Sequence, residues 1–304
     1  MSRGLGDVYK RQVALGIISR SYREVIGIAG CHGKTTITSM LALICEQGGP
    51  DATVHIGGFV DFLNGGVRLG AHDMFITEAC EYVESFLTLR PTIALINNID
   101  NDHLDYYGDM EHIVAAFKKF AALLPENGLL IGNTDDFRVR ALMAEHTGRK
   151  LSYGMKDADY TPANINYDDN GCPGFDIMFR GEKLMHIQLR IPGEHSVMNA
   201  IAAAAVAREI GADDKCIVSA LNTFRNTRRR FEYYGERNGV KYYHDYGHHP
   251  SEIAATMKAA SNVKHNKLFC VFQCNSYTRA KTLFLNDVTC FNSVSYTHLR
   301  AHET

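Results

Sequence analysis

The chain has 304 residues, of which 45% are hydrophobic and 22% charged, and its formal net charge at pH 7 is -2. This composition predicts about two globular domains, since a domain usually holds about 100–200 residues. The charge balance offers no basic surface to nucleic acid, and no stretch reaches the roughly 18 apolar residues that cross a bilayer. We therefore expect a cytoplasmic protein that binds neither nucleic acid nor membranes.

The cysteines are spread along the chain. There are 8 of them, and none forms a C-x-x-C pair. This distribution argues against a zinc ribbon and against a disulfide framework. We expect reduced thiols.

The first half of the chain alternates between two patterns. Short apolar runs of β-favouring residues occupy 24–29, 74–77, 92–96 and 128–131. Helical patterns occupy residues 36–45, 110–124 and 136–146. This alternation predicts a mostly parallel sheet that is covered by helices.

The pattern changes in the second half. Turn signals at Asn170-Gly171 and Arg180-Gly181 predict a small antiparallel hairpin or meander within residues 160–189. Two helices, at 196–210 and 213–224, and a basic linker near residues 226–230 are expected next. An α/β pattern then resumes, with strands at 230–234, 240–245 and 268–272 and a helix at 250–260.

The strongest motif lies between the first strand and the first helix. Gly30 to Thr36 read G-C-H-G-K-T-T, a short form of the glycine-rich loop that wraps backbone N–H groups around a polyphosphate. Gly30 and Gly33 allow close approach of the main chain, Lys34 supplies a cation, and Thr35 offers a hydroxyl to Mg²⁺. The pattern predicts ATP or GTP binding. The alternative is a plain strand-to-helix turn with an exposed lysine.

Three further clusters follow predicted strands or open a helix. Glu78 ends a strand, where an α/β sheet exposes its ligand-facing edge, and is therefore a candidate Mg²⁺ ligand. His103 lies in a polar segment after the next strand and is a candidate ligand for a second metal, although scattered histidines are commonly structural. His195 opens a helix at which Ser196 is a candidate N-cap.

Together these segments resemble the Mur ligase family, the ATP-dependent amide-forming enzymes of peptidoglycan precursor assembly. Besides the glycine-rich loop, the resemblance is carried by T-E-A-C-E-Y-V-E-S-F from Thr77, N-N-I-D-N-D-H-L-D from Asn97, R-R-R-F-E from Arg228 and D-Y-G-H-H-P-S-E-I from Asp245. The last segment is most similar to the branch of the family that adds the first amino acid.

The resemblance implies a role for each matching position. The ATP phosphates would be held by the loop residues Gly30, Cys31, His32, Gly33, Lys34, Thr35 and Thr36. Thr35 and Glu78 would bind one Mg²⁺ and His103 the other, while His195 and Asn199 would contact adenine and Asp245 the ribose. Arg229, Arg230 and Arg279 are candidates to reach phosphate or a substrate carboxylate, and His248 and His249 would line the same cleft.

The resemblance also implies a reaction. The carboxylate of UDP-N-acetylmuramate would attack the γ-phosphate of ATP to form an acyl phosphate, which the amine of L-alanine would convert to an amide. One alternative is the recycling ligase that joins a tripeptide to the same nucleotide sugar, or more remotely a folylpolyglutamate-type ligase. Another is a P-loop nucleotide-binding module without ligase activity. The sequence does not indicate an oligomeric state.

The domain organisation expected from these patterns is an α/β fold in two parts. Residues 13–225 would form a central ATP-binding P-loop domain, and residues 226–291 a truncated, Rossmann-like C-terminal domain. Residues 1–12 and 292–304 resemble translated adapter sequence and are expected to be non-native. Because the family's N-terminal sugar-binding domain is missing, we expect the 304-residue chain to bind ATP weakly or not at all and to lack ligase activity.

Overall fold

The computed structural model describes residues 13–225, 227–273 and 291. Its main feature is a sheet of ten strands, in the order β10-β9-β8-β7-β6-β5-β1-β4-β2-β3. The strands are β1 (Glu24–Ala29), β2 (Thr53–Val60), β3 (Gly65–Arg68), β4 (Met74–Glu78), β5 (Ile93–Ile96), β6 (Leu129–Asn133), β7 (Arg149–Tyr153), β8 (Tyr160–Tyr167), β9 (Pro173–Phe179) and β10 (Glu182–Gln188).

The central strands are parallel, as the alternating sequence pattern predicted. Strand β1 pairs in parallel with both β4 and β5, and the parallel ladder continues through β6 and β7. The pairs β2–β3, β8–β9 and β9–β10 are antiparallel. The meander expected at residues 160–189 therefore forms, and the pair Tyr153–Tyr160 joins it to the main sheet.

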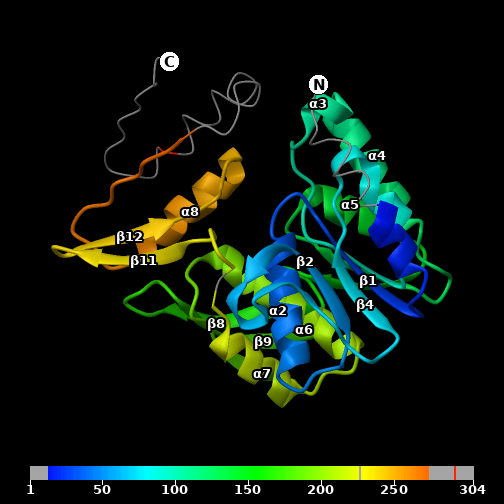
Figure 1. The fold of residues 1–304 in the computed structure, drawn as a ribbon, viewed down its shortest axis with the longest axis horizontal. Coiled ribbons are helices and arrows are strands. Elements are labelled where there is room, and N and C mark those ends of the chain that lie inside the picture. Colours follow the sequence, from blue (N-terminus) through cyan, green and yellow to red (C-terminus); the bar gives the residue numbers. More distant parts are fainter. Residues whose placement is uncertain (1–12, 226, 274–290, 292–304) are drawn as a thin grey trace.

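Helices cover both faces of this sheet (Figure 1). The helices of the first core cluster are α2 (Lys34–Glu46), α6 (Glu194–Glu209) and α7 (Asp214–Thr223), and those of the second are α4 (Met110–Ala121) and α5 (Phe137–Glu145). Strand β1 contributes to both cores, since Ile26 and Ile28 belong to the first and Ala29 to the second. Burial on both faces explains why this strand is a continuous apolar run.

The C-terminal segment is smaller. It contains a two-stranded antiparallel sheet, β11 (Glu232–Arg237) with β12 (Val240–His244), followed by helix α8 (Pro250–Asn262). The strand expected at residues 268–272 does not form: no described strand pairs with it, and Val271 is 98% exposed. An apolar run becomes a strand only where a neighbour satisfies its backbone groups.

The helices agree with their expected positions within a few residues. Helix α4 ends at Ala121 rather than residue 124, and a short helix that the sequence did not predict, α3 (Leu104–Tyr107), precedes it. Among the residues that the structure describes, no helix is both long enough and apolar enough to cross a bilayer. The expectations for residues 1–12 and 292–304 lie outside the described residues.

Candidate functional site

The site lies at the carboxyl ends of three adjacent parallel strands. Strands β5, β1 and β4 are neighbours in the sheet, and the loops that follow them carry three of the sequence motifs. Ala29 of β1 pairs with Ile96 of β5, and Ile28 pairs with Glu78 of β4, so the strands end at nearly the same level. Parallel sheets place ligands at this edge because the loops from several strands converge there.

The glycine-rich loop has the backbone geometry that its glycines predicted. Gly33 is the N-cap of α2 with φ +86°, and Gly30 has φ +136°, both in the region that side chains disfavour. Asn98 holds the loop in place, because its Oδ1 accepts from the His32 N–H at 2.8 Å and its backbone oxygen accepts from Cys31 N–H at 3.3 Å. Lys34, Thr35 and Thr36 of the first turn of α2 line a cavity, and the N–H groups of a first turn have no partner within their own helix.

Lys34 is buried in the loop rather than extended into solvent. Its Nζ lies 2.7 Å from Oε2 of Glu81 and also donates to the backbone oxygens of Gly30 and Cys31. Burial alone lowers the pKa of Lys34, but the Glu81 carboxylate outweighs it and raises the pKa well above its usual range. The ammonium is therefore charged at any physiological pH. A fixed cation at the end of a phosphate-binding loop is suited to a polyphosphate.

Glu78 lies beside this loop and contacts its threonine. Thr35 Oγ1 donates to Oε2 of Glu78 at 3.2 Å, and the Gly57 N–H donates to Oε1 at 2.6 Å. Burial is the main influence on this carboxyl and raises its pKa, although the charge of Lys34 and these hydrogen bonds oppose the shift. A hydroxyl and a carboxylate in contact are two of the oxygen ligands that Mg²⁺ uses.

A second acidic group lies around His103. The ligand atoms of Glu81, Asp102 and His103 all lie within 4.8 Å of one another. His103 Nε2 is 3.8 Å from Oε1 of Glu81 and 3.7 Å from Oδ2 of Asp102. His103 has φ +56° and precedes α3, so a left-handed backbone turn sets the direction of its side chain. The two carboxylates and one imidazole could hold a divalent cation.

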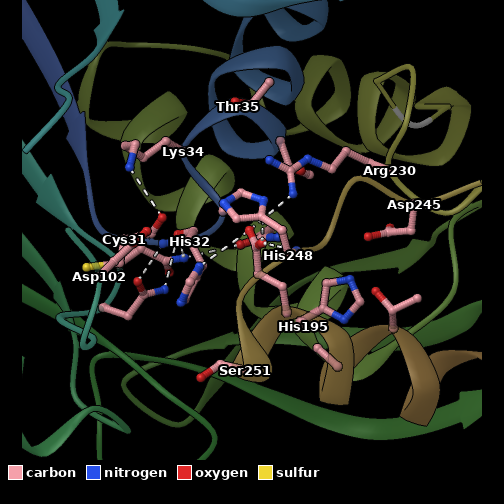
Figure 2. Close-up of a pocket in the computed structure, with 18 of the residues that line it drawn as sticks. Cys31, His32, Lys34, Thr35, Asp102, His195, Arg230, Asp245, His248 and Ser251 are labelled. Carbon is pink, nitrogen blue, oxygen red and sulfur yellow. Dashed lines mark hydrogen bonds and ion pairs between the residues drawn. The ribbon is translucent and has the colours of Figure 1, made fainter. Parts of the chain in front are cut away.

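The opposite wall of the site comes from α6 and the C-terminal segment. An open cavity of about 310 Å³ lies between these walls (Figure 2). Arg230 lines it, and its Nη1 is 3.2 Å from Oε1 of Glu252. Asp245 also lines the cavity, but both its carboxylate oxygens accept backbone N–H groups, those of Phe231 at 2.7 Å and Gly247 at 2.6 Å.

The cavity collects most of the residues that the sequence predicted for the site. Those that line it are Cys31, His32, Gly33, Lys34, Thr35, Thr36, His103, His195, Asn199, Arg230, Asp245 and His248. Glu78 is not a lining residue but contacts Thr35, and Gly30 lies below Lys34, whose Nζ binds its carbonyl. Arg279 lies outside the described residues. The roles suggested for these residues stay predictions.

Sequence reasoning missed some of the site. Glu81 and Asp102 belong to segments already singled out as motifs, but only Glu78 and His103 were selected from them. The spacing of Glu81 carried a usable signal, since it follows the same strand end as Glu78 by three residues. The role of Asn97 had no such signal, because it depends on contacts between segments: its Nδ2 donates to His32 O at 3.0 Å and to Asn199 Oδ1 at 3.4 Å.

The donor set fits Mg²⁺. Glu81 is 1% exposed and Asp102 is 9% exposed, and their carboxylates lie close together inside the protein, beside the Lys34 ammonium that pairs with Glu81. Carboxylate and hydroxyl oxygens are the ligands this hard cation prefers. Thr35 and Glu78, which are in contact, and Glu81 and Asp102, which are neighbours, supply four such groups.

Comparison with protein families identifies two matching regions. The Mur ligase middle domain matches residues 28–207, and the Mur ligase, glutamate ligase domain matches residues 229–284. A UDP-N-acetylmuramate--L-alanine ligase from Clostridium beijerinckii is 43% identical over 279 residues, which is 91% of this chain. The chain spans 61% of the length of that relative.

Two solved structures have a similar fold. A UDP-N-acetylmuramate-alanine ligase from Thermotoga maritima matches with a TM-score of 0.76 at 24% identity, over 94% of this chain and 63% of that one. A UDP-N-acetylmuramate:L-alanyl-gamma-D-glutamyl-meso-diaminopimelate ligase from Neisseria meningitides matches with a TM-score of 0.64 at 27% identity, over 75% of this chain and 78% of that one. The architecture is therefore shared by ligases that add different groups.

Proposed function

This chain belongs to the Mur ligase family, and on that premise we propose that it is part of an ADP-forming ligase that joins L-alanine to UDP-N-acetylmuramate. The observation that carries the proposal is the convergence of separate motifs on one cavity, where a buried lysine, two acidic groups and an arginine meet. The relative from Clostridium beijerinckii supports the choice of L-alanine.

The proposed roles on the nucleotide side follow from the glycine-rich loop. Lys34 and the first-turn amides of α2 would bind the ATP phosphates, because they combine a fixed positive charge with the N–H groups of a helix N-terminus. Thr35 with Glu78, and Glu81 with Asp102 and His103, would hold Mg²⁺. When bound, Mg²⁺ would neutralise charge on the transferred phosphoryl group.

The proposed roles on the acceptor side belong to the C-terminal segment. Arg230 would reach the phosphoryl group or the substrate carboxylate, since it lines the cavity across from the loop. His248 lies beside it, and its backbone N–H donates to Oε2 of Glu252 at 3.1 Å. Activation of a carboxylate as an acyl phosphate gives the amine of L-alanine a carbon it can attack, with phosphate as the leaving group.

The domain boundaries belong to the same proposal. We infer a central domain over residues 13–225 and a C-terminal ligase segment over residues 226–291, which is consistent with family matches at 28–207 and 229–284. The reaction would take place in the cytoplasm, where ATP is available and where the free thiols found among the described cysteines stay reduced.

A chimera tests the function. Residues 13–291 of this chain would replace the matching part of the Clostridium beijerinckii relative, so that the assay runs in a protein of full relative length. We expect phosphate release from ATP that requires both UDP-N-acetylmuramate and L-alanine. Lys34→Ala should abolish it, whereas Lys119→Ala should not, because Lys119 is 60% exposed and pairs with Glu84 on the surface.

The alternatives predict other results in the same assay. Release that depends on a tripeptide and not on L-alanine would identify a recycling ligase. ATP binding without amide formation from either amine would identify a nucleotide-binding module. Both results would reject the proposal.

A further inference from the structure

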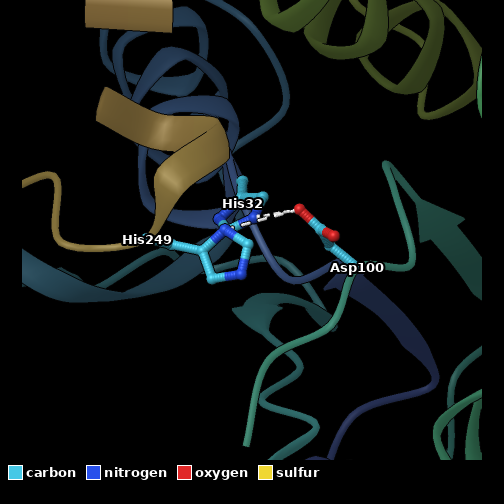
Figure 3. A group of neighbouring side chains, drawn as sticks. All are labelled: His32, Asp100 and His249. Atoms are coloured by element: carbon cyan, nitrogen blue, oxygen red, sulfur yellow. Dashed lines mark hydrogen bonds and ion pairs between the residues drawn. The ribbon is translucent and has the colours of Figure 1, made fainter. Parts of the chain in front are cut away.

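A second group of metal-ligating side chains lies outside the acidic group around His103. His32 of the glycine-rich loop, Asp100 of the loop after β5 and His249 of the C-terminal segment converge (Figure 3). Nε2 of His32 lies 3.0 Å from Oδ2 of Asp100, and Nδ1 of His249 lies 3.5 Å from the same oxygen. All three ligand atoms lie within 4.8 Å of one another.

These separations are close to those of a bound transition metal. Ligand atoms about 2.0–2.1 Å from a tetrahedral zinc ion are roughly 3.3 Å apart. The separations of 3.0 Å and 3.5 Å bracket that value, and the third lies within 4.8 Å. His249 is 4% exposed, so the site would be shielded from bulk water on the side of the C-terminal segment.

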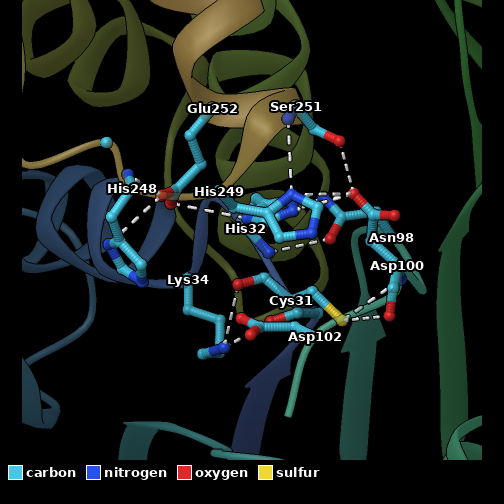
Figure 4. Close-up of polar contacts among 12 residues, drawn as sticks. Cys31, His32, Lys34, Asn98, Asp100, Asp102, His248, His249, Ser251 and Glu252 are labelled. Carbon is cyan, nitrogen blue, oxygen red and sulfur yellow. Dashed lines mark hydrogen bonds and ion pairs between the residues drawn. The ribbon is translucent and has the colours of Figure 1, made fainter. Parts of the chain in front are cut away.

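The outer nitrogen of each imidazole already has a partner (Figure 4). Nδ1 of His32 lies 3.4 Å from Oε1 of Glu252, and Nε2 of His249 lies 3.2 Å from the backbone oxygen of Asn101. A histidine that binds a metal usually donates its other N–H to a carboxylate or a backbone carbonyl, which fixes the tautomer and the ring orientation. Both rings therefore have the second contact that a metal site requires.

The tautomer of His249 is set by a further contact. The backbone N–H of Ser251 donates to Nδ1 at 3.3 Å, so Nδ1 carries the lone pair and Nε2 carries the proton toward Asn101. The same Nδ1 lies 3.5 Å from Oδ2 of Asp100. A metal ion would replace this long hydrogen bond with a stronger bond.

We propose that His32, Asp100 and His249 form a binding site for a divalent transition metal, best suited to Zn²⁺, which ties the C-terminal segment to the glycine-rich loop. Two imidazole nitrogens and one carboxylate oxygen form a ligand set typical of Zn²⁺, whereas Mg²⁺ is bound mainly through oxygen. Three protein ligands leave a fourth position for water. The site is distinct from the oxygen-rich group of Glu81 and Asp102 described above.

The site joins two parts of the chain that are distant in the sequence. His32 and Asp100 belong to the central part, and His249 is the N-cap of α8. Direct contacts already span the same gap, and the shortest of those named here is the hydrogen bond from Ser251 Oγ to Asp100 Oδ2 at 2.6 Å. A metal ion here would add coordinate bonds to that contact and would resist separation of the two parts.

A zinc titration of the 304-residue chain tests the site. The titration is performed in excess Mg²⁺, which occupies the oxygen-rich group, and a chromophoric chelator competes for zinc. We expect one equivalent bound by the wild type and by His112→Ala, which removes an exposed histidine that is also paired with an aspartate. His249→Ala should bind at least about tenfold more weakly, the lower end of what loss of a second-shell contact alone costs.

Two results of that titration would overturn the proposal. One is a wild type that binds no equivalent, and the other is equal affinity in the wild type and His249→Ala. Because His249→Ala removes the N-cap of α8 and could unfold it, X-ray absorption at the zinc edge of the wild type provides an independent measurement. Imidazole and oxygen scatterers are expected, while a sulfur scatterer would assign the zinc to cysteine and reject the site.

Limited proteolysis tests whether bound zinc holds the C-terminal segment to the glycine-rich loop. Trypsin should cleave the wild type more slowly at Arg228 to Arg230 when one equivalent of Zn²⁺ is present, and this protection should be lost in Asp100→Asn. Zinc that binds without slowing cleavage would reject the proposed tie between the two parts.

Discussion

Lys34 of the glycine-rich loop forms a buried ion pair with Glu81, which follows strand β4, with 2.7 Å between Nζ and Oε2. The lysine side chain is 14% exposed and the glutamate side chain 2%. The pair connects the loop after β1 to the loop after β4, and Glu81 also lies beside Asp102 and His103. One carboxylate thus contacts both the phosphate-binding cation and the candidate metal ligands.

The ion pair between Lys34 and Glu81 should contribute to the stability of the folded chain. Glu81→Gln should lower the free energy of unfolding of the 304-residue chain by about 3–5 kcal/mol, because it leaves a buried ammonium without its counter-charge. Glu84→Gln is the matched control, since Glu84 pairs with the 60% exposed Lys119 and such surface pairs contribute about 0–1 kcal/mol. Urea unfolding measures both. Equal losses in the two variants would contradict the prediction.

A glycine substitution separates backbone strain from steric contact. Gly33 and Gly181 both have φ +86°, but a methyl group at Gly33 would lie 2.8 Å from Asn199 Oδ1 and would collide with the Asn97 amide, whereas nothing lies within 4 Å at Gly181. Gly181→Ala should lower the free energy of unfolding by about 1–2 kcal/mol, because only backbone strain is added. Gly33→Ala should lower the free energy of unfolding further, because steric contact is added to the strain. It should also abolish ATP binding in the chimera. Calorimetric titration with ATP distinguishes the two, and retained binding in Gly33→Ala would be evidence against the loop's role.

A buried tyrosine should matter for the loop although it does not line the cavity. The hydroxyl of Tyr153, a fully buried residue, donates to Asn97 Oδ1 at 2.6 Å, and Asn97 in turn donates to the backbone oxygen of His32. Tyr153→Phe should lower the free energy of unfolding by about 1–3 kcal/mol, because the Asn97 oxygen loses its hydrogen-bond donor in the protein interior. Tyr242→Phe, at a residue that is 51% exposed, should change stability little. If urea unfolding gave the same value for both variants, the Asn97 contact would carry no energy.

The stability of the folded chain should depend on pH through the ionisation of His32. Burial disfavours its charge, but Asp100 and Glu252 outweigh burial and raise the pKa of His32 from 6.5 to about 9. A raised pKa stabilises the folded state below pH 6.5, and this contribution is lost as the pH rises through 9. Metal-free wild type should therefore lose more stability between pH 6.5 and 9.5 than His32→Gln. Parallel pH curves for the two proteins in urea unfolding would rule out this contribution.

Helices and strands could be predicted from the sequence where the local pattern of apolar residues agrees with their burial in the structure. Strand β1 was predicted with its bounds, because burial on both faces makes it an uninterrupted apolar run ahead of a glycine turn. Strands β2 and β7 were not predicted from the sequence, although both pair with neighbouring strands in the sheet. Their sequences mix polar and apolar residues at positions that only the neighbouring strands and helices cover.

The same division applies to the site. The sequence by itself determined the glycine-rich loop, the acid at the end of β4 and the family, because those features depend on residues close together in the chain. Only the tertiary structure decided that Lys34 pairs with Glu81, 47 residues away, and that His32 meets Asp100, 68 residues away. Such pairs depend on which strands become neighbours, and strand order follows from packing the whole sheet, which no local spacing records.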